Sequence, residues 1–424
     1  MDIFVKVFLV STSLLWLKAP FTHAASETDT SRLRKDLLTG YDKNSRPVQN
    51  HRDTTRVKVN FILKGLDLDE RKSIFNMHAW TVLVWEDGHM KWDPKSYGNI
   101  TRVHFSAHEL WQPDLTVYNN ADKSEIDHFG NTRLIVYNSS HVVWVPPTKF
   151  QVPCQTDLRK WPYDQQTCSI NVGSWAHDGT TLDILIPSNI STMDVTDFRP
   201  NREWDLISNT FEKRTKYFAE VPYPDIVLKL NLARKSSSHT ACVVIPGLAI
   251  AAAILIAFWL PPGSSERLSI LLVTILINVL YLYYVYSAIP NNGDSVPLVL
   301  LFYRDSLFML AFALVWTVCL RYLAATKRDS PVPLPSFITG FLASFPAKIL
   351  CLDPRPTTGR RENTGSEGNE QGDGAANGNP NPFGSGVEKN NPFQDDWAWL
   401  AHLLDRVAFM VYLIIYMIFY LALL

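Results

Sequence analysis

Hydrophobic and polar positions alternate in short runs over the first half of the chain, from about residue 26 to 235. Gly, Pro, Asn and Asp separate these runs at short intervals. Alternation with a period of two is typical of strands that are buried on one face. The runs that predict strands are 57–63, 80–85, 134–136, 142–145, 182–186 and 226–232. We therefore expect an all-β sandwich, preceded by a helix over 31–40.

The second half of the chain has a different pattern, because four long segments are almost wholly apolar. They lie at about 240–260, 268–289, 298–322 and 400–424. Each is close to the roughly 20 residues that a helix needs to cross a bilayer. The fold class that follows is a β-sandwich extracellular domain joined to a four-helix transmembrane bundle.

The N-terminus predicts how this chain is oriented. Residues 1–25 carry Lys6, an apolar run and small residues at Ala24 and Ala25, a pattern typical of a cleaved signal peptide. We expect residues 26–235 to lie outside the cell, and an even number of spans returns the C-terminus to the outside. Basic residues after the third span favour a cytoplasmic loop there.

The domain plan follows from these segments. Residues 236–326 would hold transmembrane helices one to three, 327–397 the cytoplasmic loop and 398–424 the fourth helix. Within the loop, 334–350 is too short and interrupted for a span, so we expect an interfacial helix that lies on membrane lipid. Residues 353–392 are rich in Gly, Asn, Pro and Glu, which predicts a disordered linker.

Cysteines and sequons agree with an extracellular first half. Cys154 and Cys168 are expected to form a disulfide, since nothing outside the cell reduces such a pair. Three glycosylation sequons, at Asn99, Asn138 and Asn189, precede residue 200.

Composition and motifs exclude several classes of function. A formal net charge of −1 gives no indication of a nucleic-acid partner. The sequence has no nucleophile elbow, phosphate-binding loop or metal-ligand spacing, so we expect neither an enzyme nor a bound metal or cofactor. A channel subunit, a transporter and an adhesion or receptor protein remain.

Ten stretches carry a more specific signal. In chain order they are RPVQNH (46–51), LDLDE (66–70), WTVLVWEDGHMKWDP (80–94), LWQPDLTVYNNAD (110–122), CQTDLRKWPYDQQTC (154–168), VGSWAHDG (172–179), PYPD (222–225), GSSERLS (263–269), DSVPL (294–298) and LLDR (403–406). Together they make the chain similar to the pentameric Cys-loop ligand-gated channels, and it resembles a divergent, non-α nicotinic acetylcholine receptor subunit. The resemblance covers nearly the whole mature chain except the cytoplasmic linker.

This resemblance implies a role for the ring that the two cysteines close. In the family, the ring presses its tip onto the membrane helices and relays ligand binding to the gate. The tip residues here are Trp161, Pro162, Tyr163 and Asp164. We expect them to pack near the linker 294–298, with Glu70 and Arg234 taking part. A ring that only staples the sandwich is the alternative, and both roles can hold.

The resemblance also implies a cation site made of aromatic faces at a subunit interface. The principal face would be Tyr118, Trp175 and Tyr223. The complementary face would be Trp80, supported by Ile135, Val143 and Val145. In α-type subunits two adjacent cysteines precede the PYPD-like stretch, whereas this chain has Phe218 and Ala219 there, and His177 replaces a usual tyrosine. The departures favour a complementary role centred on Trp80, although core packing is the commoner role of an isolated aromatic residue.

The second apolar segment would line the pore. The implied pore-facing residues are Glu266, Ser269, Val273, Leu276, Leu280, Tyr283 and Ser287. A ring of Glu266 carboxylates favours cation selectivity, although this acid also complements a helix dipole. Leu276 falls at the family's leucine gate. Bulky Tyr283 near the outer end favours assembly with other subunits into a hetero-pentamer.

Three functions therefore compete. The leading one is a subunit of an acetylcholine-type cation channel in the postsynaptic plasma membrane. The others are a non-conducting regulatory subunit and a membrane-tethered protein that binds an amine. Two Asn-Pro-Phe tripeptides, ending at Phe383 and Phe393, resemble motifs that EH-domain endocytic adaptors bind, but so short a motif also recurs by chance.

Overall fold

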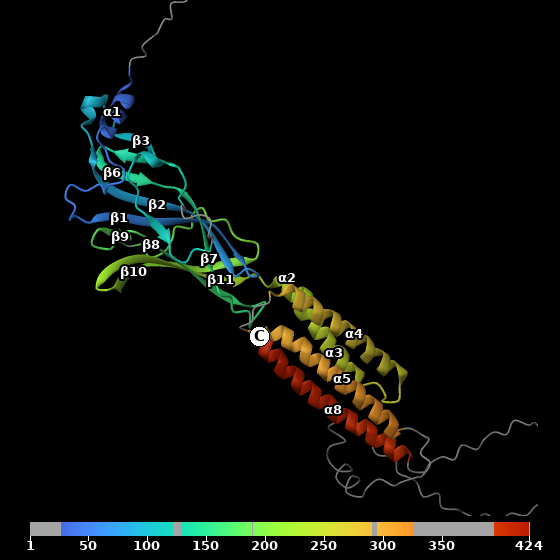
Figure 1. Ribbon diagram of the computed structural model, residues 1–424. Helices are drawn as coiled ribbons and strands as arrows, with labels where there is room; N and C mark the ends of the chain where they lie inside the picture. Colours follow the sequence, from blue (N-terminus) through green and yellow to red (C-terminus); the bar gives the residue numbers. More distant parts are fainter. Residues whose placement is uncertain (1–26, 122–128, 189, 291–294, 325–393, 424) are drawn as a thin grey trace, which may run out of the picture.

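The computed structural model describes residues 27–121, 129–188, 190–290, 295–324 and 394–423. Its β-rich half and its helical half lie end to end along one long axis (Figure 1). The expected signal peptide (1–25), interfacial helix (334–350) and linker (353–392) lie outside the described residues, as do both Asn-Pro-Phe motifs.

Two sheets form the β-rich half. The larger runs in the order β3 (Arg102–Ser106), β5 (Arg133–Tyr137), β6 (Ser139–Trp144), β2 (Ile74–Lys91), β1 (Thr55–Asp69) and β9 (Leu182–Leu185), with β7 (Pro147–Pro153) also paired to β2. The smaller runs β10 (Trp204–Phe218), β11 (Val221–Arg234), β8 (Gln165–Ser174) and β4 (Leu115–Val117). Neighbouring strands are antiparallel except β1 and β9. Helix α1 (Asp29–Leu38) and the short turns η1 (Pro94–Tyr97) and η2 (Ala107–Glu109) complete this half.

Aromatic side chains join the two sheets. Phe61 on β1 meets Phe150 on β7 and Phe211 on β10 edge to face, with ring centroids 6.0 and 6.1 Å apart. Alternating burial along β2 turns every second side chain into this core. Each buried side chain of this size contributes about 1.5–3 kcal/mol through apolar burial. The sandwich therefore follows from the period-two pattern.

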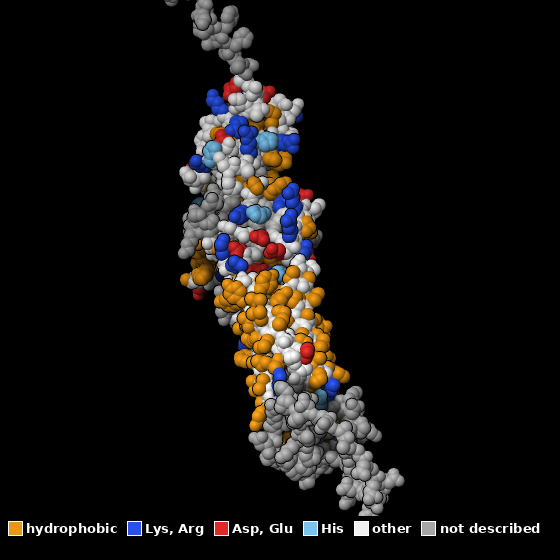
Figure 2. Space-filling model, turned by 90° about the vertical axis from the view of Figure 1, so that its right-hand side faces the viewer, with side chains coloured by type: hydrophobic (Ala, Val, Ile, Leu, Met, Phe, Trp, Pro, Cys, Tyr) orange, Lys and Arg blue, Asp and Glu red, His pale blue; other side chains and the backbone are white. Residues whose placement is uncertain are grey.

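Within the described residues, four membrane-length helical segments form the other half. The first span, Ser237–Ala257, combines α2 (Ser237–His239), a π-helical turn η3 (Thr240–Val244) and α3 (Ile245–Ala257). The others are α4 (Ser265–Ala288), α5 (Leu298–Ala324) and α8 (Gln394–Leu423). All four are long and apolar enough to cross a membrane. Hydrophobic side chains cover the visible face of this half, while charged side chains gather on the sheets (Figure 2).

Local chemistry explains where these helices begin. Ser264 caps α4, since its side chain accepts a hydrogen bond from the Arg267 amide. The π turn precedes Pro246, which has no amide hydrogen to donate to the carbonyl four residues earlier. The expected fold class, a β-sandwich followed by four transmembrane helices, is confirmed.

Candidate functional site

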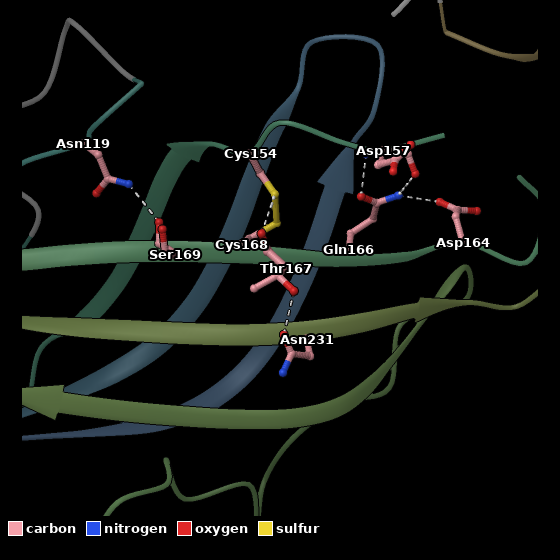
Figure 3. Close-up of a disulfide and its surroundings, with 9 residues drawn as sticks. All are labelled: Asn119, Cys154, Asp157, Asp164, Gln166, Thr167, Cys168, Ser169 and Asn231. Atoms are coloured by element: carbon pink, nitrogen blue, oxygen red, sulfur yellow. Dashed lines mark hydrogen bonds between the residues drawn. A yellow bond between two sulfur atoms is a disulfide. The ribbon is translucent and has the colours of Figure 1, made fainter. Parts of the chain in front are cut away.

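The cysteine ring lies at the end of the sandwich that faces the helices. Cys154, just after β7, is bonded to Cys168 on β8, as expected. Inside the ring, Gln166 donates hydrogen bonds to the Asp164 carboxylate and the Asp157 carbonyl at 2.7 and 2.8 Å (Figure 3). Its side-chain oxygen accepts from the Asp157 amide. These bonds hold both arms of the ring in one conformation.

A buried cluster of three charges joins the ring to two strands. Arg234, the last residue of β11, donates two hydrogen bonds to Asp164, at 2.7 and 3.0 Å, and a further one to Glu70. The Arg234 side chain is only 4% exposed. Burial acts to lower the pKa of Arg234, but the hydrogen bonds to both carboxylates outweigh it and raise that pKa. The guanidinium therefore stays charged.

The tip of the ring touches the first membrane-spanning segment. Trp161 is buried against His239 with ring centroids 4.9 Å apart, and the Tyr163 hydroxyl lies 3.0 Å from that of Thr240. The ring also reaches the third span, since the Leu298 amide donates to the Arg159 carbonyl at 2.9 Å. The tip residues Trp161 and Tyr163 thus contact the first span, and the cysteine ring also meets the expected linker 294–298 at its last residue, Leu298. Asp294, the first residue of that linker, lies outside the described residues.

Three predicted aromatic residues line one hollow beside the smaller sheet. Tyr118 follows β4, Trp175 follows β8 and Tyr223 lies on β11, around a hollow of about 520 Å³. Ser174, Lys216 and Phe218 also line it. Trp175 is 74% exposed, so its ring is available to a partner.

Hydrogen bonds hold this aromatic wall in place. The Asp114 carboxylate accepts from the Ser174 hydroxyl and from the Ala176 amide, both at 2.6 Å, and so fixes the chain on either side of Trp175. The Tyr118 hydroxyl donates to the Ser174 carbonyl at 2.6 Å. Burial, followed by the nearby Asp225, raises the pKa of Tyr118 to about 12, so its hydroxyl is neutral at physiological pH.

The β10–β11 hairpin lacks the cysteines that α-type subunits have at this place. Ala219 and Glu220 form its tip, both with positive φ, and the Phe218 ring packs on Tyr223 at 5.6 Å. Below the tip, Arg214 pairs with buried Asp225 at 2.6 Å, and this hydrogen bond raises the pKa of Arg214. An ion pair and a ring contact therefore stabilise the hairpin.

Trp80 lies on the other sheet, in a separate hollow of about 620 Å³ lined by Lys64, Gly65, His78, Trp80, Asp197 and Arg199. The Trp80 side chain points outward from β2 and is 44% exposed. Ile135 and Val143 face each other across β5 and β6, and Val145 follows β6. These three described residues do not line the hollow at Trp80. The three aromatic residues of the predicted principal face and Trp80 of the predicted complementary face thus lie in different places on one chain.

Among the residues at these hollows, Lys64, Lys216 and Phe218 were not predicted as site residues. Lys64 lies over the Trp80 ring, and Lys216 and Phe218 line the other hollow. For Lys64 a signal existed, because Gly65 interrupts an alternating strand pattern and so predicts a bulge. For Lys216 and Phe218 nothing in the mostly exposed hairpin pattern indicates which side chains turn toward Tyr223.

The predicted pore residues share one exposed face of α4. Glu266, Ser269, Val273, Leu276, Leu280, Tyr283 and Ser287 are all exposed in the single chain. Buried Arg267, Leu271, Thr274, Asn278 and Val285 point instead toward the other helices. Helical periodicity separates the two faces, so the exposed face is free to line a conduit or meet other subunits.

An ion pair fixes the lower end of α4 inside the bundle. Arg267 donates two hydrogen bonds to Asp405 on α8, at 2.6 and 2.8 Å, and a third to the Thr317 hydroxyl on α5 at 3.0 Å. Both charged side chains are at most 3% exposed. This pair connects the helix with the predicted pore face to the fourth helix of the chain, through residues of the GSSERLS and LLDR stretches.

Two of the three sequon asparagines are described. Asn99 is exposed and follows the left-handed Gly98, and Asn138 is half-buried in the turn between β5 and β6. Asn189 lies outside the described residues.

Comparisons with known proteins agree with this geometry. A family model described as the neurotransmitter-gated ion-channel ligand binding domain matches residues 30–236. Acetylcholine receptor subunit alpha-like 2 of Drosophila melanogaster is 30% identical over 77% of this chain and 58% of its own length. Acetylcholine receptor subunit alpha-type acr-16 of Caenorhabditis briggsae is 33% identical, with 72% and 61% covered.

A β-type relative is also similar. Neuronal acetylcholine receptor subunit beta-2 of Rattus norvegicus is 28% identical over 83% of this chain and 70% of its own length. The chain spans 58% and 61% of the first two relatives that it matches. With its sandwich, its disulfide ring and its four apolar helices, the chain belongs to the Cys-loop family of neurotransmitter-gated ion channels.

Proposed function

We propose that this chain is a non-α subunit of an acetylcholine-type cation channel. It assembles with other nicotinic-type subunits into a hetero-pentamer in the postsynaptic membrane. There it contributes Trp80 as the complementary face of a ligand site and α4 as one wall of the pore. Its N-terminus and C-terminus lie outside the cell.

One observation carries the proposal: an unbroken series of contacts runs from the ligand-binding half to the membrane helices. Arg234 joins Asp164 and Glu70, and the next residues of the ring, Trp161 and Tyr163, contact the first span. A protein that only tethers a binding domain to the membrane has no need of such a connection. A gated channel does, because ligand binding must displace distant helices.

The assignment as non-α rests on the β10–β11 hairpin. Phe218 and Ala219 stand where α-type subunits have two cysteines, and Lys216 adds a positive charge to the aromatic hollow on this side of the chain. Without the paired cysteines this wall lacks a feature of α-type principal faces, so Trp80 is the aromatic residue that we propose this chain offers to a quaternary ammonium ligand.

Cation selectivity rests on the pore helix. Glu266 is exposed at the start of α4, on the same face as Leu276. Several copies around an axis would form a ring of carboxylates, which attracts cations and repels anions. Leu276, with 61% of its surface exposed in the single chain, would supply the apolar ring of the gate.

The test is the current evoked by acetylcholine in oocytes that express this chain alone or with an α-type subunit. We expect current only with the partner. Trp80→Ala should raise the half-maximal concentration about two- to thirtyfold, since each aromatic face contributes about 0.5–2 kcal/mol to holding a cation. Trp175→Ala is the matched control, because Trp175 is an exposed tryptophan of the principal-type wall. It should leave the sensitivity unchanged.

The other outcomes separate the competing functions. A shift with Trp175→Ala but not with Trp80→Ala would mean that the chain supplies the principal face. Surface expression that alters the number of partner receptors without adding a conducting species would support a regulatory subunit. Exposed Tyr283 and Tyr284 on the pore helix favour that second function, because bulky rings narrow a conduit.

A further inference from the structure

Lys64 occupies an unusual place in strand β1. The pairing of β1 with β2 shifts between Leu63, opposite Ala79, and Gly65, opposite His78. Lys64 is the extra residue that this bulge leaves without a partner in the ladder. Bulges redirect side chains, and here the bulge turns the lysine toward the next outward-facing residue of β2, which is Trp80.

The contact between the two side chains is close. The Lys64 ammonium lies 3.5 Å from the centroid of the Trp80 ring. This is well within the roughly 6 Å at which a cation is attracted by an indole face. The side chain of Lys64 is 20% exposed, while Trp80 is exposed enough to meet a neighbouring subunit. The aromatic face that a ligand cation would use therefore already holds a cation of the same chain.

A carboxylate keeps Lys64 at this place. Lys64 forms an ion pair with Asp197, whose segment runs alongside β1. Backbone hydrogen bonds fix that segment on both sides of Asp197: the Leu63 amide donates to the Asp194 carbonyl at 2.8 Å, and the Arg199 amide donates to the Lys64 carbonyl at 2.9 Å. The lysine is thus held by a bulge, a ring and an acid that the backbone positions.

We propose that Lys64 is an internal competitor for the ligand cation, so that a quaternary ammonium ligand must displace it from Trp80 toward Asp197. This inference rests on the proposed function, because it concerns the same complementary face. Two cations near one indole repel each other and share one attractive ring. Lys64 would therefore make the receptor less sensitive to agonist than it would be if the Trp80 ring were free.

The test is a double-mutant cycle in receptors of this chain with an α-type subunit. The variants are Lys64→Gln, Trp80→Ala and the two combined, assayed by acetylcholine-evoked current and by equilibrium binding of radiolabelled acetylcholine. Lys64→Gln should lower the half-maximal concentration about two- to fivefold, the range expected for an exposed cation–π contact. In the Trp80→Ala background the same substitution should have no effect, since no ring is left to release.

Two control variants separate charge from structure. Lys58→Gln removes an exposed lysine from the same outward side of β1, and it should leave sensitivity unchanged. Lys64→Arg keeps a cation over Trp80 and should also behave as the unmodified chain. Binding is measured alongside current, so an assembly that binds without conducting still reports on Lys64.

Each result decides a different claim. Suppose that Trp80→Ala changes the half-maximal concentration, but Lys64→Gln and Lys58→Gln give the same value. Lys64 then does not compete with the ligand, and the inference is overturned. The inference is also overturned if Lys64→Gln changes the half-maximal concentration by the same factor in the unmodified chain and in the Trp80→Ala background. If Trp80→Ala itself has no effect on current or binding, the complementary role under the proposed function fails, and the inference fails with it.

Discussion

Arg234 is a buried residue that makes several contacts at the junction of the two halves. It pairs with two carboxylates, and its guanidinium also lies 4.4 Å from the ring centroid of Trp204. The pKa of Arg234 is raised above the ordinary value for arginine, which is already high. The stability that this charge contributes is therefore lost only when the pH rises through that raised pKa. The Arg234 guanidinium therefore keeps its charge across the physiological range.

Replacing Arg234 by Gln should strongly reduce both assembly and gating. The change leaves buried Asp164 and half-buried Glu70 without their cation, and breaking a buried ion pair costs about 3–5 kcal/mol. We expect little surface protein by antibody labelling of intact cells. Arg234→Lys keeps the charge but loses the paired hydrogen bonds, so it should restore surface protein more than it restores maximal current.

Arg71→Gln is the control for this position. Arg71 is exposed, and its side chain makes a long, 3.5 Å hydrogen bond to the Ser287 carbonyl. Its replacement should change surface labelling little. Equal losses for Arg71→Gln and Arg234→Gln would show that the buried cluster has no special part in the junction.

At the scale of elements, the pair of Arg267 and Asp405 links α4 to the distant α8. Asp405→Asn removes one charge and leaves the Arg267 guanidinium buried in an apolar bundle. We expect a loss of about 3–5 kcal/mol in stability, seen as a lower thermal midpoint of detergent-solubilised receptor. Asp305→Asn is the matched control, because Asp305 pairs with neighbouring Arg304 nearer the surface of α5.

The combined variant Arg267→Met with Asp405→Leu extends this test. It replaces both charges by apolar side chains, and such an exchange is often neutral for stability. We expect the thermal midpoint of the combined variant to lie close to that of the unmodified receptor, well above that of Asp405→Asn. A combined variant as unstable as Asp405→Asn would contradict the view that an unpaired charge causes the loss.

Elements with a simple pattern could be predicted from the sequence, and others could not. The expected strands at 57–63 and 80–85 lie within β1 and β2, whose side chains alternate between core and solvent. Strand β10 gave no such signal, because most of its side chains are exposed on both faces. The first residues of strand β8, before Cys168, are polar, although the strand lies between β11 and β4 in the sheet and buries alternate side chains. Pairing with neighbours, rather than hydrophobicity, defines such strands.

The candidate site shows the same division. Motifs indicated Tyr118, Trp175 and Tyr223, and the fold brings these distant residues to one hollow. The lysine over Trp80 depends on a bulge and on a loop more than 130 residues away along the chain, at Asp197. Contacts of that kind arise from tertiary structure and leave little trace in a local pattern.

The whole molecule is a multi-pass protein of the plasma membrane in a family of ion channels, not of enzymes. Its helical half exposes apolar side chains on the visible face in Figure 2, while α4 exposes polar residues at its two ends. A bilayer or other subunits must cover most of this surface. Under the proposed function, a pore forms only when several subunits assemble.

Selectivity is therefore a prediction about the assembly. Glu266→Gln in this chain should reduce single-channel conductance for cations and shift the reversal potential toward lower cation selectivity, because the ring at the pore mouth loses negative charge. Dilution of external salt during voltage-clamp recording measures the shift. Glu220→Gln, at the exposed hairpin tip, should not alter permeation. Equal conductance for both variants would place the selectivity elsewhere.

The π turn at Thr240–Val244 divides the first span into two parts with different phase. Each residue of an α-helix turns the chain by about 100°, so one additional residue in a turn rotates everything beyond it by roughly that angle. His239 above the turn faces the cysteine ring, and Ile250 and Ile254 below it face the bundle. A helical wheel drawn through the whole span would assign these faces wrongly. Faces must be counted from each side of the turn, and in that sense the span is two helices that share an axis.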